Sequence, residues 1–325
     1  RSLRLRPVEG PETGRTGHRL MGLALGYFAH RKKAPLAVRS VLAPLFGKRV
    51  RGLIGHSVDI ATVIGTIFGV ATSLGIGVVM LNVGLNILFG IPQGLGAQTA
   101  LVVLAVVLAT ISATTGVDKG IRSLSQLNVA LAVVLAGWAL FTGNTTFLLR
   151  SMVMNIGDFV TMFPGMTLDT MAYDYPAGWM QSWTLFFWAW WIAWAPFVGS
   201  FIARVSRGRT IREFILGCLF IPALGSFTWF AIFGTSALHL ELVQGVKIAN
   251  DIIKDVSVGA FELYRHYPLG TIMSYIMLIL ISTFFVTSAD SGTFVLGMYS
   301  TQGILNPPRT RTAIWGILMG ALAVV

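Results

Sequence analysis

The sequence predicts an all-α protein that crosses a membrane several times. Of its 325 residues, 54% are apolar and only 11% are charged, and the mean hydropathy is +0.74. Ordinary soluble domains contain about 25% charged residues. The longest uncharged run covers 58 residues, from Ile60 to Val117, whereas about 20 residues of helix suffice to cross a bilayer. Composition and run length together indicate a polytopic protein of the cell membrane.

Uncharged windows define the expected spans. The run from Ile60 to Val117 contains the breaker Gly90-Ile91-Pro92-Gln93-Gly94, so it holds two helices. Four further windows hold one helix each: Ser123–Leu149, Tyr175–Ala203, Phe214–Leu240 and His266–Ala289. The apolar ends, Leu20–His30 and Ala313–Val325, are too short to cross. We therefore expect six complete transmembrane helices plus two truncated ones, as in a piece of a larger protein.

The net charge of +11 is sorted by membrane side. Taking the connecting segments alternately, one set (31–58, 118–122, 203–213 and 290–312) holds fifteen basic residues, and the other (143–182 and 239–268) holds four. This asymmetry follows the positive-inside rule and places the 203–213 segment in the cytoplasm. A nucleic-acid surface would not sort by membrane side, so nucleic acid is not an expected partner.

Enzymatic and metal signatures are missing from the sequence. Its one cysteine, Cys218, lies in a span, and its five histidines show no metal-ligand spacing. No GxSxG or Walker A motif occurs. We therefore expect neither an enzyme nor a cofactor.

The first seventeen residues differ from the rest of the chain. They carry four arginines and almost no apolar periodicity, and no signal-peptide core follows them. Residues 1–17 are therefore predicted to be a disordered basic tail, or sequence foreign to the protein, and residues 18–325 form the membrane domain.

Five of the nine tryptophans lie between Trp183 and Trp194. On a helix counted from Trp183 to before Arg204, the side chains of Trp190, Trp194 and Trp191 point at about 0°, 40° and 100°, near the middle of the membrane, whereas Trp188 points away. These three form what we call the tryptophan face. An aromatic belt is the alternative, but belts lie at headgroup depth. Electron-rich rings at this depth suit a quaternary ammonium ion, which is recognised by cation–π attraction.

Polar groups interrupt the last complete window. Thr287, Ser288 and Asp290 follow Phe284 within a long apolar stretch, where polar groups are costly without a partner. The two hydroxyls either bind a hard cation such as sodium or bond back to the preceding turn. Asp290 either transfers protons or pairs with a cytoplasmic arginine.

A stripe of small residues recurs every four positions in the first complete span: Gly65, Gly69, Ser73 and Gly77. Such spacing lets helix backbones approach closely in lipid, so the stripe indicates helix packing.

Several segments resemble one family, the betaine/choline/carnitine transporters. They are FFWAWWIAWAPFVGSFIARVSRGRTIREF at 186–214, TSADSG at 287–292 and GVDKGIRSLSQLNVAL at 116–131. Within that family the chain is most similar to the choline transporters. The resemblance implies a partial inverted-repeat bundle of the leucine-transporter kind, alternating access around a midplane site, and trimeric assembly.

The resemblance also assigns roles to residues. It implies that the tryptophan face binds substrate, with Trp188 and Phe197 along the pathway, and that Phe284, Thr287 and Ser288 contribute to a sodium site. Thr66 matches the first threonine of a second ion site, but Val70 stands where the family's sodium-coupled carriers have the second. This departure favours proton coupling. The third helix of the family is missing from the sequence, as is most of the fourth, which completes the aromatic cage.

The sequence therefore predicts a secondary transporter that imports choline, coupled to a proton or sodium gradient. Two alternatives remain open: a glycine betaine/sodium symporter, and a truncated chain that transports nothing. Carnitine exchange is disfavoured because Asn128 stands where the exchangers have an arginine. A channel is disfavoured because no charged or carbonyl-lined pore motif is visible.

Overall fold

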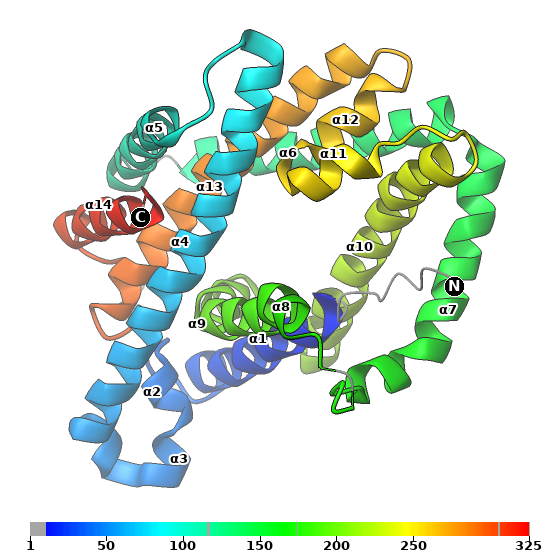
Figure 1. The fold of residues 1–325 in the computed structure, drawn as a ribbon. Helices are drawn as coiled ribbons and strands as arrows, with labels where there is room; N and C mark the ends of the chain where they lie inside the picture. Colours follow the sequence, from blue (N-terminus) through cyan, green and yellow to red (C-terminus); the bar gives the residue numbers. More distant parts are fainter. Residues whose placement is uncertain (1–10, 116–117, 174, 305, 325) are drawn as a thin grey trace. The chain divides into compact units, whose positions relative to one another are not determined.

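The protein is helical in every regular element that the computed structural model describes (Figure 1). The described residues are 11–115, 118–173, 175–304 and 306–324. The longer helices are α1 (Pro11–Gly26), α4 (Leu53–Phe89), α5 (Leu95–Thr115), α6 (Asp118–Thr142), α7 (Thr145–Leu168), α9 (Phe186–Val205), α10 (Ile211–Leu242), α13 (Gly270–Tyr299) and α14 (Arg309–Val324). The shorter ones are α2 (Val38–Val41), α3 (Ala43–Phe46), α8 (Ala177–Trp179), α11 (Ala249–Lys254) and α12 (Gly259–Arg265).

Five described segments are long and apolar enough to cross a membrane: Leu53–Phe89, Ser123–Thr142, Ala177–Val205, Ile211–Leu242 and Gly270–Tyr299. The sixth expected span is helix α5, whose apolar part, Leu95–Ile111, is shorter. The all-α polytopic class is thus confirmed. The two apolar ends of the sequence fall in α1 and α14, each 16 residues long.

The expected break between the first two spans occurs where the glycines and proline stand. Gly90 adopts a left-handed φ of 71°, which glycine reaches without steric cost. The buried side chain of Asn82 then closes the loop: its amide oxygen accepts the Gly94 N–H at 3.1 Å, and its amide nitrogen donates to the Pro92 carbonyl at 3.3 Å. These bonds satisfy two backbone groups of the loop that joins α4 to α5.

Helix α7 is a difference from expectation, because residues 143–182 read as a connecting segment. Asn144 begins this helix by accepting the Phe147 N–H at 3.1 Å, which is an N-cap. Arg150 and Asp158 lie within the helix, so no uncharged window of membrane length exists there. A search of the sequence for uncharged windows therefore missed this helix.

The amino-terminal prediction needs a partial correction. Residues 1–10 lie outside the described part, but α1 begins at Pro11, so residues 11–17 are helical instead of disordered. The boundary between tail and membrane domain stays a prediction.

The chain divides into two compact units, and each is described by itself. Unit 1 takes its residues from Arg1–Val70, Val160–Ala223 and Phe294–Thr312. Unit 2 takes them from Ala71–Phe159, Leu224–Thr293 and Ala313–Val325.

In unit 1, α1 lies along α9 (Figure 1). The backbones meet where two glycines face each other: a Cβ on Gly22 would lie 3.3 Å from the Gly199 carbonyl oxygen, and a Cβ on Gly199 would lie 3.0 Å from the Gly22 nitrogen. Residues Leu25 and Ala203, 1% and 0% exposed, continue this contact. Small residues thus set the α1–α9 distance.

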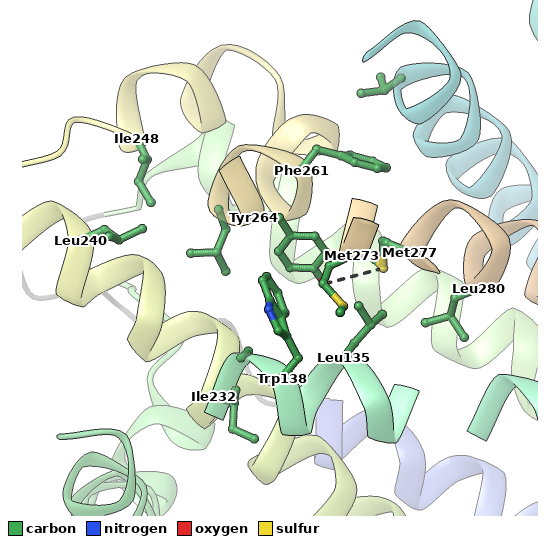
Figure 2. Close-up of a cluster of buried hydrophobic side chains, with 13 residues drawn as sticks. Leu135, Trp138, Ile232, Leu240, Ile248, Phe261, Tyr264, Met273, Met277 and Leu280 are labelled. Atoms are coloured by element: carbon green, nitrogen blue, oxygen red, sulfur yellow. Dashed lines mark hydrogen bonds between the residues drawn. The ribbon is translucent and has the colours of Figure 1, made fainter. Parts of the chain in front are cut away.

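Unit 2 has the larger cluster of buried apolar side chains, drawn in Figure 2. The Trp138 and Tyr264 rings meet edge to face with centroids 5.1 Å apart. The Tyr264 hydroxyl points to the Met277 sulfur at 3.9 Å, and Trp138 Nε1 donates to the Pro268 carbonyl at 2.8 Å. Both polar tips therefore have partners inside an apolar core.

Replacing Trp138 by phenylalanine tests this arrangement. The ring contact survives, but the hydrogen bond to the Pro268 carbonyl is lost, so we expect a loss of about 1 kcal/mol in the free energy of unfolding. Thermal unfolding in detergent measures it. Trp188→Phe is the control because Trp188 is 39% exposed. Equal stability of the two variants would contradict the role given to the hydrogen bond.

Candidate binding site for an organic cation

The helix that carries the tryptophans is longer than the sequence count implied. The span runs from Ala177 to Val205, 29 residues, instead of beginning at Trp183. It comprises α8, a π-helical segment (Met180–Leu185) and α9. The tryptophan face stays central, since Trp190 lies thirteen residues after Ala177 and Trp194 eleven before Val205.

Successive rings form one continuous file along this helix. Trp183 stacks on Phe187 with centroids 6.0 Å apart, and Phe187 lies 5.8 Å from Trp190. The three rings of the tryptophan face are mutually in contact, at 6.2 Å (Trp190–Trp191), 6.5 Å (Trp190–Trp194) and 5.9 Å (Trp191–Trp194). The expected clustering of these rings on one helix face is therefore confirmed.

The two other aromatic residues singled out in this helix differ from each other. Phe197 is 7% exposed and extends the file, with its ring 5.8 Å from that of Trp194. Trp188 is 39% exposed. Phe197 is thus part of the ring file, and Trp188 is well placed to serve as a comparison.

His18 of α1 covers part of the tryptophan face. Its ring centroid lies 4.9 Å from that of Trp191 and 5.7 Å from that of Trp194. His18 is 3% exposed, and its Nε2 lies 3.1 Å from the Trp191 carbonyl oxygen, which makes Nε2 the donor. Helical periodicity could not predict this contact, because it joins residues 173 positions apart. A fourth ring therefore opposes the face.

The indole nitrogens of the face have different surroundings. Trp190 Nε1 donates to the Gly69 carbonyl of α4 at 3.1 Å, which fixes that ring. Trp194 Nε1 is buried, and within the described residues it has no hydrogen-bond partner. A donor left in this state is costly unless a ligand oxygen meets it.

Tyr299 supports the helix just after the tryptophans. Its hydroxyl donates to the Pro196 carbonyl at 2.6 Å and lies 2.5 Å from the Ser200 oxygen. Pro196 has no N–H, so the Ile192 carbonyl loses its helical donor. Tyr299 therefore adds hydrogen bonds at the point where the α9 ladder is weakened.

Thr66 is the candidate ion-coupling residue of unit 1. It is 0% exposed, and its hydroxyl oxygen has no hydrogen-bond partner among the described residues. Val70, one turn later, is also buried and has no side-chain oxygen. Thr62, one turn earlier, is buried too, and its hydroxyl donates to the Val58 carbonyl at 2.8 Å. Of the pair Thr66 and Val70, only Thr66 thus offers a side-chain oxygen.

The other candidate ion-coupling residues lie on α13 in unit 2. Phe284 and Ser288 line a cavity of about 410 Å³ together with Ser73 and the Trp229 ring. The Thr287 hydroxyl instead donates to the Thr283 carbonyl at 2.9 Å. Bonding to the preceding turn is one of the two alternatives that the sequence left open. Its oxygen lone pairs stay open to an ion, so this bond does not decide its role.

Two further polar residues are buried in unit 2. Asp290 is 6% exposed, and its pairing or proton-transfer role stays a prediction. Asn128 is 2% exposed and accepts a hydrogen bond from the Thr283 hydroxyl, which ties α6 to α13. Asn128 is thus a neutral, hydrogen-bonded amide in the core of unit 2.

Taken together, these features define a multi-pass membrane protein of the transporter class. The polar and aromatic groups sit within long apolar helices, as in carriers of small solutes. Residues 16–325 match the family model for the betaine/carnitine/choline family transporters (BCCT). The chain therefore belongs to this family of transporters. It is accordingly not an enzyme.

Curated relatives of the chain are also named as transporters. The chain is 52% identical over 290 residues to the high-affinity choline transport protein of Escherichia coli K12, covering 89% of this chain and 43% of that protein. It is 49% identical to the osmo-dependent choline transporter BetT2 of Acinetobacter baylyi, covering 95% and 46%. It is 43% identical to the glycine betaine transporter OpuD of Bacillus subtilis 168, covering 94% and 59%. The chain thus spans about half the length of these relatives.

Proposed function

We propose that this chain is part of a secondary active transporter that imports a quaternary ammonium compound, with choline as the leading substrate. The observation that carries the proposal is the continuous ring file of α9, in which Trp190, Trp191 and Trp194 are in mutual contact. The transporters named for choline are also more similar to the chain than the one named for glycine betaine.

The chemistry of the site fits such a cation. A trimethylammonium group keeps its charge at every pH and has no N–H to donate, so rings are its natural partners. Each well-placed ring contributes roughly 0.5 to 2 kcal/mol, so three or four rings give useful affinity. The hydroxyl oxygen of choline can accept a hydrogen bond from the Trp194 indole, whose N–H has no described partner.

Ion coupling by this transporter is proposed at hydroxyl oxygens and one carboxylate. Ser288 and Phe284 line the unit 2 cavity, and Thr287 stands beside them. These oxygens suit sodium. Thr66 offers one further side-chain oxygen, but Val70 offers none. Because the second threonine is missing, a two-sodium mechanism is disfavoured. A single sodium site, or proton transfer through Asp290, is favoured instead.

Uptake by reconstituted proteoliposomes tests the proposal. We expect labelled choline to accumulate only when an inward proton or sodium gradient is imposed, and betaine to compete more weakly than choline. Accumulation after collapse of both gradients would contradict secondary transport. Stronger competition by betaine would favour the glycine betaine symporter.

Ser288→Ala separates the two ions. We expect it to abolish stimulation by sodium and to leave stimulation by protons unchanged, because it removes a cavity-lining oxygen. The matched control is Ser282→Ala on the same helix, whose hydroxyl is already bonded to the Leu278 carbonyl at 2.7 Å. Loss of sodium stimulation in both variants would argue against a site at Ser288.

A transport-inactive chain is the second candidate. Its signature is choline binding, measured by scintillation proximity, without uptake.

Trimeric assembly is proposed from the family resemblance, and mass photometry in detergent measures it.

A further inference from the structure

A second cavity lies in unit 1, away from the ring file. Its volume is about 590 Å³. One wall comes from the end of α1 and the π-helical turn that follows (Tyr27–Arg31), and the other comes from the segment between α9 and the start of α10. Both walls belong to the same unit, so the cavity is a property of that unit alone.

Positive charge dominates the polar part of this cavity. Arg31 and Arg209 line it from opposite walls, and both are exposed. No ion pair joins either guanidinium to a carboxylate within the described part of the chain. His30 also lines the cavity, and its Nε2 donates to the Ala203 carbonyl at 2.7 Å, which holds the ring in the wall.

Glu213, the acid nearest to Arg209 in sequence, caps a helix and also lies close enough to Arg209 to interact with it electrostatically. Glu213 accepts the Thr210 N–H at 2.9 Å, and the Thr210 hydroxyl accepts the Glu213 N–H at 3.2 Å. This reciprocal capping box begins α10 and keeps the carboxylate at the helix end. The Thr210 side chain and the first turn of α10 then add donors to the same wall.

Apolar side chains also line the cavity. They are Leu23, Ile211 and Phe214, of which Ile211 is 56% exposed and Phe214 is buried. The cavity also lies between the ends of two spans, since Val205 ends one span and Ile211 begins the next. The positive-inside rule places this end on the cytoplasmic side. A site that is basic on one side and apolar on the other at this boundary matches an anionic lipid.

We propose that this cavity binds the headgroup of an anionic glycerophospholipid of the cytoplasmic leaflet. The phosphate lies between Arg31 and Arg209, where guanidinium groups offer paired donors. The acyl chains leave along Leu23, Ile211 and Phe214. A free phosphate ion would use the charged half only, so the apolar side chains distinguish the two ligands.

Native mass spectrometry of the purified chain tests the proposal. After delipidation, we expect phosphatidylglycerol to be retained over phosphatidylcholine. Arg31→Gln combined with Arg209→Gln should weaken phosphatidylglycerol binding by about 30-fold, since each basic residue near an anionic surface contributes about 1 kcal/mol. Arg31→Lys combined with Arg209→Lys should weaken phosphatidylglycerol binding less than the glutamine pair does, because lysine keeps the charge but lacks the paired donors of the guanidinium.

The matched control is Arg207→Gln combined with Arg212→Gln, which removes the same charge from two residues that flank Arg209 in sequence and do not line the cavity. An equal loss of lipid in the control would overturn the proposal in favour of a diffuse basic surface. Complete displacement of phosphatidylglycerol by millimolar inorganic phosphate would also overturn it, in favour of a free-phosphate site. Retention of lipid is read without any transport assay, so the outcome is independent of the proposed function.

Discussion

Replacing Trp190 and Trp194 together by leucine is expected to weaken choline binding by roughly 5- to 1,000-fold. Two rings at roughly 0.5 to 2 kcal/mol each amount to about 1 to 4 kcal/mol, which sets that range. Leucine keeps the helix apolar but removes the electron-rich faces. Equilibrium binding of labelled choline to the chain in nanodiscs measures the effect.

Two controls separate cation–π attraction from loss of fold. Trp188→Leu removes an indole from the same helix at a position 39% exposed, so we expect its choline affinity to stay near that of the parent. The neutral isostere 3,3-dimethyl-1-butanol should lose less affinity in the double variant than choline does, because it has choline's shape and hydroxyl without the charge. An unchanged choline affinity in the double variant would remove the ring file from the site.

Most of the membrane fold follows from the sequence because burial in lipid demands long uncharged helices. The break at Gly90–Gly94 could also be predicted from the sequence, since glycine adopts left-handed backbone conformations without steric cost and proline lacks the N–H that a helix needs. Helix α7 was missed because Arg150 and Asp158 divide its apolar residues. The π-helical segment Met180–Leu185 was missed for another reason: no residue pattern in the run marks it.

The candidate site was predicted in its local part and not in its long-range part. Neighbours on one helix follow from a rise and a turn per residue, so the contacts among Trp190, Trp191 and Trp194 were foreseen. The contact with His18 depends on how α1 packs against α9, at a distance of 173 residues in sequence. The same holds for the Trp190 bond to the Gly69 carbonyl, which spans 121 residues. Periodicity carries no information about either.

The small-residue stripe acquires a specific role from these contacts. A Cβ on Gly69 would lie 3.0 Å from the Trp194 nitrogen and 3.1 Å from the Ala193 carbonyl carbon. Both are backbone atoms of α9, which cannot move aside as a flexible side chain does. At Gly65 a Cβ would lie 3.6 Å from the Ala193 carbonyl oxygen, an ordinary contact. The α4–α9 approach is therefore tight at one glycine and relaxed at the other.

Gly69→Val is accordingly expected to be among the most damaging single substitutions in unit 1. Overpacking of this kind costs about 1 to 3 kcal/mol. It also pushes the Gly69 carbonyl away from Trp190 Nε1, so choline affinity should fall together with the free energy of unfolding. Steric trapping in detergent measures the stability, and binding of labelled choline measures the site.

Gly65→Ala is the matched substitution on the same stripe. It should keep choline affinity unchanged and raise helix stability by up to about 1 kcal/mol, since alanine is the better helix former. If Gly65→Ala and Gly69→Val lowered stability equally, the stripe would act as a uniform packing surface. If Gly69→Val lost stability but kept its choline affinity, the Trp190 ring would not depend on the α4 contact. The expected result, with both properties lost at Gly69 and neither at Gly65, would tie the geometry of the tryptophan face to one close approach of two helix backbones.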